Sequence, residues 1–124
     1  VAVKYAVRVN GIDALALTKL DVLDDQHEIN VCTGYRCDNK VLSSPPASVG
    51  QLARCAPEYE VLQGWADTGG CAGVRRESDL PPAARAYIAR LEDLCGAPAA
   101  IISTGSDRHD TIVREGGLAS RWLK

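Results

Sequence analysis

Hydrophobic residues recur along this chain in short blocks, and the spacing within each block predicts a helix or a strand. The clearest block runs from Leu80 to Cys95, where apolar residues recur at intervals of three and four and so share one face of a helix. That face consists of Ala84, Tyr87, Ile88, Leu91, Leu94 and Cys95. Asp79 is a candidate cap for the first turn of this helix, and Gly96 is expected to end it.

Two short apolar runs predict strands that are buried on both faces, as in a parallel sheet. One extends from Ala14 to Leu17 and turns polar at Thr18. The other extends from Ala99 to Ile102 and leads into a polar loop from Ser103 to Ser106. Because parallel strands end at the same edge of a sheet, we expect both polar loops at one edge, where open α/β sheets bind ligands.

The remaining segments alternate between strand-like and loop-like sequence. Further strands are predicted from Glu28 to Tyr35, from Tyr59 to Leu62 and from Thr111 to Val113. Ser48 opens a capping-box pattern that predicts a short helix to about Ala56, where Pro57 stops it. A glycine-rich loop is predicted from Trp65 to Arg76.

The first ten residues are compatible with two elements. Apolar residues alternate from Val1 to Val9, which taken alone indicates a strand. The same stretch also places several small and apolar residues on one face of a helix, and Gly11 would then end that helix in a left-handed conformation.

The composition is that of a globular domain with an aliphatic core. Of 124 residues, 46% are hydrophobic and 24% are charged, while only 5% are aromatic and Phe is absent. The net charge is -2 and no cluster of Lys and Arg occurs, so we expect no nucleic-acid binding. No apolar run approaches the ~20 residues of a membrane span, so we expect no membrane insertion.

The cysteines and the chain start bear on the cellular context. The chain has five cysteines, an odd number, and none forms a C-x-x-C pair. We therefore expect reduced thiols in a cytoplasmic protein and no metal site among them. The residues from Val1 to Lys4 do not resemble a signal peptide. Methionine is absent even at position 1, so we expect residues 1–124 to be one segment of a longer protein.

The candidate chemistry lies from Thr18 to Asp21. Guanine presents its N1–H and its 2-amino group side by side, and the Asp21 carboxylate would accept from both, which selects guanine over adenine. Lys19 would lay its methylene stem over the purine ring. The loop from Ser103 to Gly105 would offer backbone N–H groups to the guanine 6-oxygen. Lys-x-Asp alone is a weak signal, and an ordinary strand end with solvated side chains is the alternative.

Several separated motifs strengthen this interpretation because together they are typical of one enzyme family. They are Tyr5 to Gly11, Leu15 to Leu23, Tyr59-Glu60, Gly64-Trp65, Gly73-Val74, Asp79 to Pro81, Ile102 to Gly105 and Asp107-Arg108. In this order, from Tyr5 to about Val113, they resemble the C-terminal part of adenylosuccinate synthetase. The resemblance implies an α/β fold, with part of a mostly parallel sheet flanked by helices and a GTP-binding architecture like that of P-loop NTPases. It also favours a helix, ended at Gly11, for the first ten residues.

The resemblance implies a GTP-dependent ligase that joins IMP and L-aspartate into adenylosuccinate and releases GDP and phosphate. In this family GTP phosphorylates the IMP 6-oxygen, Mg²⁺ supports that transfer and aspartate displaces the phosphate. The family's guanine contacts map onto Lys19, Leu20 and Asp21 and onto Ser103, Thr104 and Gly105. Its catalytic residues have no counterpart here, so we expect no catalytic residue and no Mg²⁺ ligand in the segment, which would be inactive alone. The family is usually homodimeric.

Some positions are assigned other roles. His27 is expected to be a solvated residue of a polar turn, and a Ser-His-Asp site from Ser106, His109 and Asp110 rests on sequence proximity only. Asp107-Arg108 is expected to form a salt bridge that fixes its loop.

The chain also departs from the family pattern. Ser106 stands where the family often has Pro, and the tail from Arg114 to Lys124 does not resemble a family C-terminus. A standalone guanine-nucleotide-binding or interaction module, derived from the enzyme and without catalysis, is the alternative function.

Overall fold

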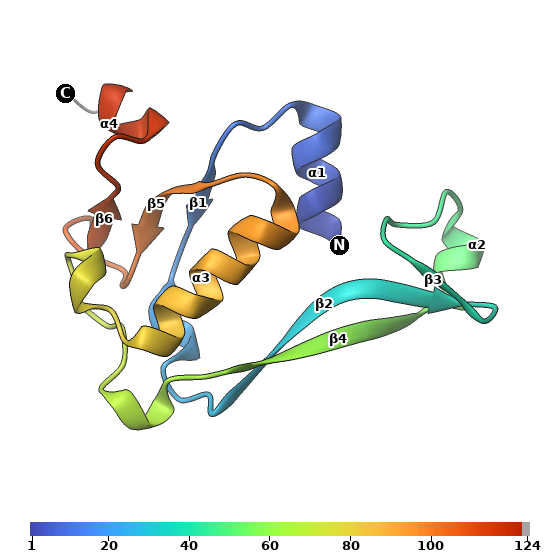
Figure 1. Ribbon diagram of the computed structural model, residues 1–124, viewed down its shortest axis with the longest axis horizontal. Coiled ribbons are helices and arrows are strands. Elements are labelled where there is room, and N and C mark those ends of the chain that lie inside the picture. The colour runs from blue at the N-terminus through green and yellow to red at the C-terminus, as the bar shows by residue number, and fades with distance from the viewer. Residues whose placement is uncertain (123–124) are drawn as a thin grey trace.

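The computed structural model describes residues 1–122 and arranges them as two sheets with helices beside them. The helices are α1 (Ala2–Asn10), α2 (Val49–Leu52), α3 (Pro82–Cys95) and α4 (Leu118–Trp122). The strands are β1 (Leu15–Leu17), β2 (Glu28–Cys37), β3 (Lys40–Leu42), β4 (Ala56–Gln63), β5 (Ala99–Ser103) and β6 (Thr111–Val113). Three 3-10 turns, η1 (Leu20–Leu23), η2 (Ala66–Thr68) and η3 (Glu77–Asp79), lie in the connections. Figure 1 shows α3 beside β1 and β5, while β2 and β4 form a long ribbon that reaches away from them.

The sheet of order β1-β5-β6 carries the predicted ligand edge. β1 runs parallel to β5, with Leu17 paired to Ile102, and β6 runs antiparallel to β5. The carboxyl ends of β1 and β5 therefore meet, as the sequence predicted. β5 is largely buried, but Ala16 of β1 is exposed, so the expectation that β1 is buried on both faces was wrong.

The second sheet has the order β3-β2-β4 and is entirely antiparallel. The two sheets and their helices confirm the α/β class. β2 and β4 pair with each other and do not extend the parallel pair of β1 and β5. The β2–β3 hairpin was not predicted, and its turn uses positive φ at Asp38 (47°) and Asn39 (64°). α2 ends at Leu52 rather than near Ala56, and Pro57 lies inside β4 instead of ending a helix. Proline is tolerated there because β4 is an edge strand.

The helix ends follow from glycine, as the sequence indicated. Gly11 has φ 61° and donates its N–H to the Val7 carbonyl, which confirms a helix rather than a strand for the first ten residues. Gly96 ends α3 in the same way, with φ 74°. The expected cap by Asp79 was wrong, because its carboxylate accepts hydrogen bonds from Arg76 (2.8 Å) and from Ser78 (3.1 Å).

The core lies between α3, β5 and the loops that follow β1 and β4. Its buried members are Leu20, Ile29, Trp65, Cys71, Leu80, Ala84, Ile88, Ala99, Ile102 and Ile112. The ring of Trp65 packs 5.7 Å, centroid to centroid, from that of Tyr87 on α3. Because these residues come from every segment around the carboxyl ends of β1 and β5, packing fixes the backbone at that edge.

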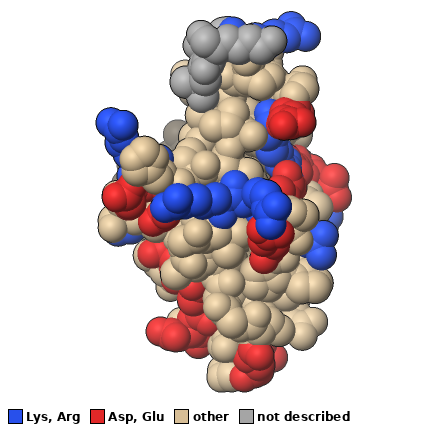
Figure 2. Space-filling model, turned by 90° about the vertical axis from the view of Figure 1, so that its left-hand side faces the viewer, with Lys and Arg blue, Asp and Glu red and all other residues tan. Residues whose placement is uncertain are grey.

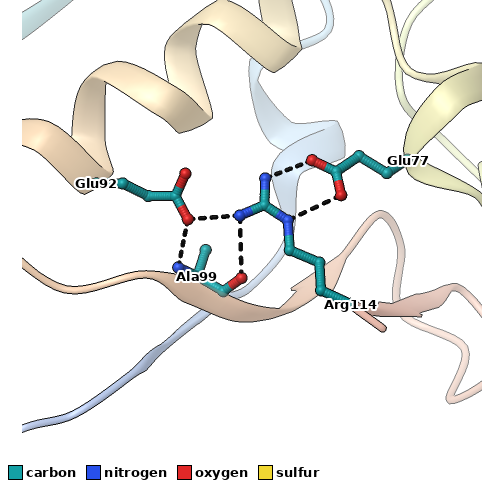
Figure 3. A network of polar contacts seen from close by, with 4 residues as sticks. All are labelled: Glu77, Glu92, Ala99 and Arg114. Atoms are coloured by element: carbon teal, nitrogen blue, oxygen red, sulfur yellow. Dashed lines mark hydrogen bonds and ion pairs between the residues drawn. The ribbon is translucent and has the colours of Figure 1, made fainter. Parts of the chain in front are cut away.

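Arg114 ties the chain after β6 to the body of the fold (Figure 3). Its guanidinium forms a bidentate pair with Glu77, and it also donates to Glu92 of α3 and to the Ala99 carbonyl of β5 (3.2 Å). Glu92 in turn accepts the Ala99 N–H at 2.6 Å. Arg114 is the first residue of the tail that does not resemble a family C-terminus, and its guanidinium is held by these contacts. The last two residues of that tail, Leu123 and Lys124, lie outside the described residues.

We expect Arg114→Met to lower the free energy of unfolding by about 1–3 kcal/mol, because it leaves Glu77 and Glu92 without their partner in partly buried surroundings. Urea unfolding of the complete protein measures the change. Arg36→Met is the matched control, since Arg36 pairs with Glu58 at the surface and should cost less than about 1 kcal/mol. Equal losses in both variants would contradict the structural role of Arg114.

Candidate functional site

Three loops meet at the carboxyl ends of β1 and β5. We call them the β1 loop (residues 18–24), the glycine loop (residues 65–74) and the β5 loop (residues 103–110). The β1 and β5 loops leave from paired strand positions, because Leu17 lies beside Ile102. The predicted site segments are therefore neighbours in space, although more than 80 residues separate them in the sequence.

The β1 loop turns at Lys19, which adopts a left-handed backbone conformation with φ 56° and ψ 51°. This conformation costs about 1 kcal/mol or more in a residue other than glycine. It sends Leu20 into the core, where only 4% of the residue is exposed, and leaves Thr18 and Lys19 at the surface. The next residue, Asp21, is then half-buried at the start of η1.

The carboxylate of Asp21 is incompletely paired. Its Oδ1 atom is the buried side-chain oxygen that finds no hydrogen-bond donor among the described residues. Buried polar atoms are nearly always paired, and an unpaired one costs about 1–3 kcal/mol, more when it is charged. A donor that reached this atom would remove that cost.

Asp24, which the sequence did not single out, holds the glycine loop against the β1 loop. Its Oδ1 accepts from the Trp65 indole N–H and from the Cys71 N–H, both at 2.7 Å, and its Oδ2 accepts from the Ala72 N–H at 3.1 Å. Gly70 has φ 76°, and a Cβ there would lie 2.6 Å from Asp24 Oδ2. The close approach of Asp24 and the positive φ therefore both favour glycine at position 70.

Cys71 lies at the centre of this arrangement and is fully buried. Burial is the main cause that raises the pKa of its thiol to about 12, and the negative charges of Asp24 and Asp21 add to the rise. The thiol therefore stays protonated near neutral pH and adds no charge beside the two carboxylates.

The β5 loop is joined to the glycine loop through Thr104. This fully buried residue donates its hydroxyl to the Val74 carbonyl at 2.7 Å, and its own carbonyl accepts the Gly73 N–H at 3.3 Å. Its N–H donates to the Asp110 carbonyl at 2.8 Å, so Thr104 has no backbone donor left for a ligand. In the part of the chain that the structure describes, the Gly105 N–H has no such acceptor.

Gly105 itself is required by a close approach. A Cβ at this position would lie 2.6 Å from Asp110 Oδ2. Ser103 donates its hydroxyl to the Gly105 carbonyl at 2.9 Å, which closes the loop on itself. The β5 loop is thus a small, internally bonded unit.

A hollow of about 250 Å³ lies next to the β1 loop. Its lining is Leu17, Thr18, Lys19, Leu20, Val22, Leu23, Tyr87 and Leu91. Asp21 and the β5 loop do not line it. The hollow therefore lies between the β1 loop and α3, and it includes Lys19 and Leu20 of the predicted base site but not Asp21 or the β5 loop.

Both histidines of the chain are exposed. His27 is exposed and lies 3.3 Å from the carboxylate of Asp67. Asp110 pairs with Arg75 at 3.5 Å rather than with the exposed His109, so the Ser-His-Asp arrangement is not assembled.

The β5 loop is not fixed by the expected ion pair between Asp107 and Arg108. Instead, the carboxylate of Asp107 accepts the backbone N–H of His109 at 2.7 Å. The Asp107 carbonyl also accepts the Asp110 N–H at 3.0 Å. These bonds fix the turn through the backbone and leave the charge of Arg108 to solvent, since that residue is exposed.

The surface beside β6 carries charges of both signs. Figure 2 shows a band of basic side chains there with acidic side chains next to it. Ion pairs of this region join Arg75 to Asp110 and Arg76 to Asp79. No group of three or more His, Cys, Asp or Glu within residues 1–122 is placed to hold a metal ion. No helix in the described part of the chain is long and apolar enough to cross a membrane.

Comparison with known proteins gives consistent matches. Residues 1–112 match the family model described as adenylosuccinate synthetase. Adenylosuccinate synthetase 1, chloroplastic, of Ricinus communis is 50% identical over 112 residues, which is 90% of this chain and 25% of that protein. The adenylosuccinate synthetase of Halorhodospira halophila is 45% identical over 115 residues, which is 93% of this chain and 26% of that protein.

A solved structure matches as well. It is that of fully ligated adenylosuccinate synthetase from Plasmodium falciparum, with a TM-score of 0.83 and 28% identity, covering 90% of this chain and 27% of that one. This match supports the α/β architecture expected from the sequence. The chain spans about a quarter of the length of the curated relatives it matches.

Proposed function

Because this chain belongs to the adenylosuccinate synthetase family, we propose that residues 1–124 form the C-terminal, guanine-recognising segment of a GTP-dependent ligase. The complete enzyme would join IMP and L-aspartate into adenylosuccinate, with release of GDP and phosphate. The observation that carries the role of this segment is the buried, unpaired Oδ1 atom of Asp21 at the edge where β1 and β5 end.

Asp21 would supply selectivity for the base. The guanine N1–H and 2-amino group present two donors to one carboxylate, and they would satisfy the oxygen that lacks a partner in the described chain. Adenine presents no such pair of donors, so with ATP the carboxylate would stay buried and unpaired. Rejection of a base by an unpaired polar group is the strong form of hydrogen-bond discrimination.

Lys19 and Leu20 would act together. The left-handed turn at Lys19 buries Leu20, and this anchor leaves the Lys19 side chain free at the surface to cover one face of the purine. The second loop would contribute through its backbone. Thr104 is committed to internal bonds and would serve as scaffold, whereas Ser103 shapes the turn and the Gly105 N–H would meet the guanine 6-oxygen.

The chemical step would depend on residues outside this segment. We place the catalytic residues and the Mg²⁺ ligands elsewhere in the enzyme, as the family resemblance implies. Mg²⁺ would neutralise charge during phosphoryl transfer. We further propose that the enzyme is a homodimer in the cytoplasm and that the segment is inactive alone.

The complete enzyme tests this function. Formation of adenylosuccinate from IMP and L-aspartate is followed by absorbance with GTP or with ATP as the phosphate donor. We expect turnover with GTP and a kcat/KM at least about a hundredfold lower with ATP, since the discrimination rests on unpaired buried groups. Equal use of both nucleotides would remove guanine recognition from the proposal, and no product with either would remove the ligase activity.

A further inference from the structure

The strand bounds and register place two cysteines opposite each other at one tip of the β2–β4 ribbon. Figure 1 shows this tip, beside α2 and β3, at the far end from β1 and β5. Cys37 is the last residue of β2, and Cys55 immediately precedes β4. Arg36 and Ala56 are paired across the two antiparallel strands. Cys37 and Cys55 occupy the next position on each strand, so they lie opposite one another.

The two thiols converge on a single acceptor. Both Sγ atoms reach the carbonyl oxygen of Gln51, from 3.7 Å for Cys37 and from 3.2 Å for Cys55. Cys37 is also among the groups that raise the pKa of the Cys55 thiol. Cys37 is 3% exposed, whereas Cys55 is half-buried and is the more accessible of the two.

This placement fits the geometry of a disulfide. Facing residues of an antiparallel pair have Cα atoms about 4.5–5.5 Å apart, which lies within the range of about 4.4–6.8 Å that disulfides require. Cys32 lies on the same strand but faces Tyr59, so it has no thiol opposite it. Of the cysteines on the ribbon, Cys37 and Cys55 are therefore the two that face each other.

We propose that Cys37 and Cys55 form a redox-active dithiol that a low-molecular-weight disulfide, such as glutathione disulfide, converts reversibly into an intramolecular disulfide. The thiolate of Cys55 attacks one sulfur of glutathione disulfide, which forms a mixed disulfide and releases one glutathione. The thiolate of Cys37 then attacks the Cys55 sulfur and releases the second glutathione. Two protein thiols are thereby oxidised, and their two electrons and two protons appear on two glutathione thiols.

The surroundings make the first step dependent on pH. Burial first, and then the contact with Cys37 and the charge of Asp38, raise the pKa of the Cys55 thiol to about 11, while Arg54 opposes the rise. The thiolate is therefore scarce near neutral pH and becomes more abundant as the pH increases. Oxidation should accelerate with rising pH up to that pKa.

The bridge would lock the tip of the ribbon. It would connect the end of β2 to the start of β4 and enclose β3 and α2 in one covalent loop. Cross-links of this kind restrict the unfolded chain and so stabilise the enclosed segment. The ribbon tip lies away from the β1 loop, so the pair makes no part of the proposed base site (Figure 1).

Differential alkylation of the complete protein tests the proposal. The protein is equilibrated in buffers of decreasing ratio of reduced to oxidised glutathione, its free thiols are alkylated, and its peptides are mapped by mass spectrometry. We expect Cys37 and Cys55 to lose alkylation together, a peptide linking them to appear, and dithiothreitol to reverse both changes. Cys32→Ser should leave the bridge unchanged, whereas Cys55→Ser should abolish it and leave Cys37 free or glutathionylated.

The wild-type protein alone decides the question, so the test does not depend on the folding of a variant. A glutathione adduct on Cys55 that persists without a link to Cys37 would overturn the proposal, and so would a bridge from either residue to Cys32. Neither measurement uses ligase activity, so failure of the redox pair and failure of the proposed function are distinguishable.

Discussion

Asp21→Asn is expected to lower kcat/KM for GTP in the complete enzyme by about ten- to a hundredfold, which corresponds to ~1–3 kcal/mol. The substitution replaces one carboxylate oxygen by an amide N–H₂ group, which would face a guanine donor instead of accepting from it. The buried atom in question is the one that lacks a partner among the described residues. The KM for IMP should change little, because the effect is confined to the guanine base.

Asp21→Asn should also use a different nucleotide better than the wild type does. Xanthine carries an oxygen where guanine carries its 2-amino group, so the amide of Asn at position 21 would match it, and use of xanthosine triphosphate should improve relative to GTP. Steady-state kinetics with both nucleotides measure the ratio. Asp25→Asn, an exposed position in the same acidic stretch, is the matched control and should leave the ratio unchanged. An unaltered KM for GTP in Asp21→Asn would remove Asp21 from the guanine site.

Asp24→Ala is expected to lower the free energy of unfolding by about 3 kcal/mol, because each buried donor left unpaired costs ~1–3 kcal/mol. The variant would leave the Trp65 indole N–H and the Cys71 N–H without their acceptor in the core. Urea unfolding gives the global change, and hydrogen exchange at the Cys71 amide gives the local one. Asp25→Ala should stay within about 0.5 kcal/mol of the wild type.

Asp24→Ala should also weaken the binding of GTP. Asp24 positions the glycine loop, and Gly73 and Val74 of that loop bond to Thr104 of the β5 loop. A loosened glycine loop would therefore raise the KM for GTP without touching a base contact. If Asp24→Ala unfolds like the wild type and keeps the amide of Cys71 protected, Asp24 does not hold the glycine loop against the β1 loop.

The local elements followed from the sequence where one residue type determines the backbone. Gly11 and Gly96 ended α1 and α3 as predicted, because a left-handed helix end favours glycine whatever lies around it. Pro57 was misjudged for the opposite reason. Its effect depends on whether its strand has one neighbour or two, and pairing between β2 and β4 is a tertiary fact that the local sequence does not contain.

The candidate site was likewise predictable in part. The rule that parallel strands end at one edge predicts that the segments with Asp21 and Gly105 lie together, and the register of β1 and β5 agrees. Asp24 was missed because its partners are 41 to 48 residues away and two of the three are backbone N–H groups, which leave no signature in side-chain chemistry. The internal commitment of Thr104 was hidden for the same reason.

The closed form of the β5 loop has a consequence for the thermodynamics of binding. Ser103 and Thr111 are paired across β5 and β6, at the two ends of the loop. Within the loop, Thr104 bonds to Asp110 and Ser103 bonds to Gly105. A loop that is already ordered has little conformational entropy to lose when a ligand arrives. A nucleotide held by this loop should therefore bind with a small entropic penalty from the protein, so that desolvation and hydrogen bonding at the base set the affinity.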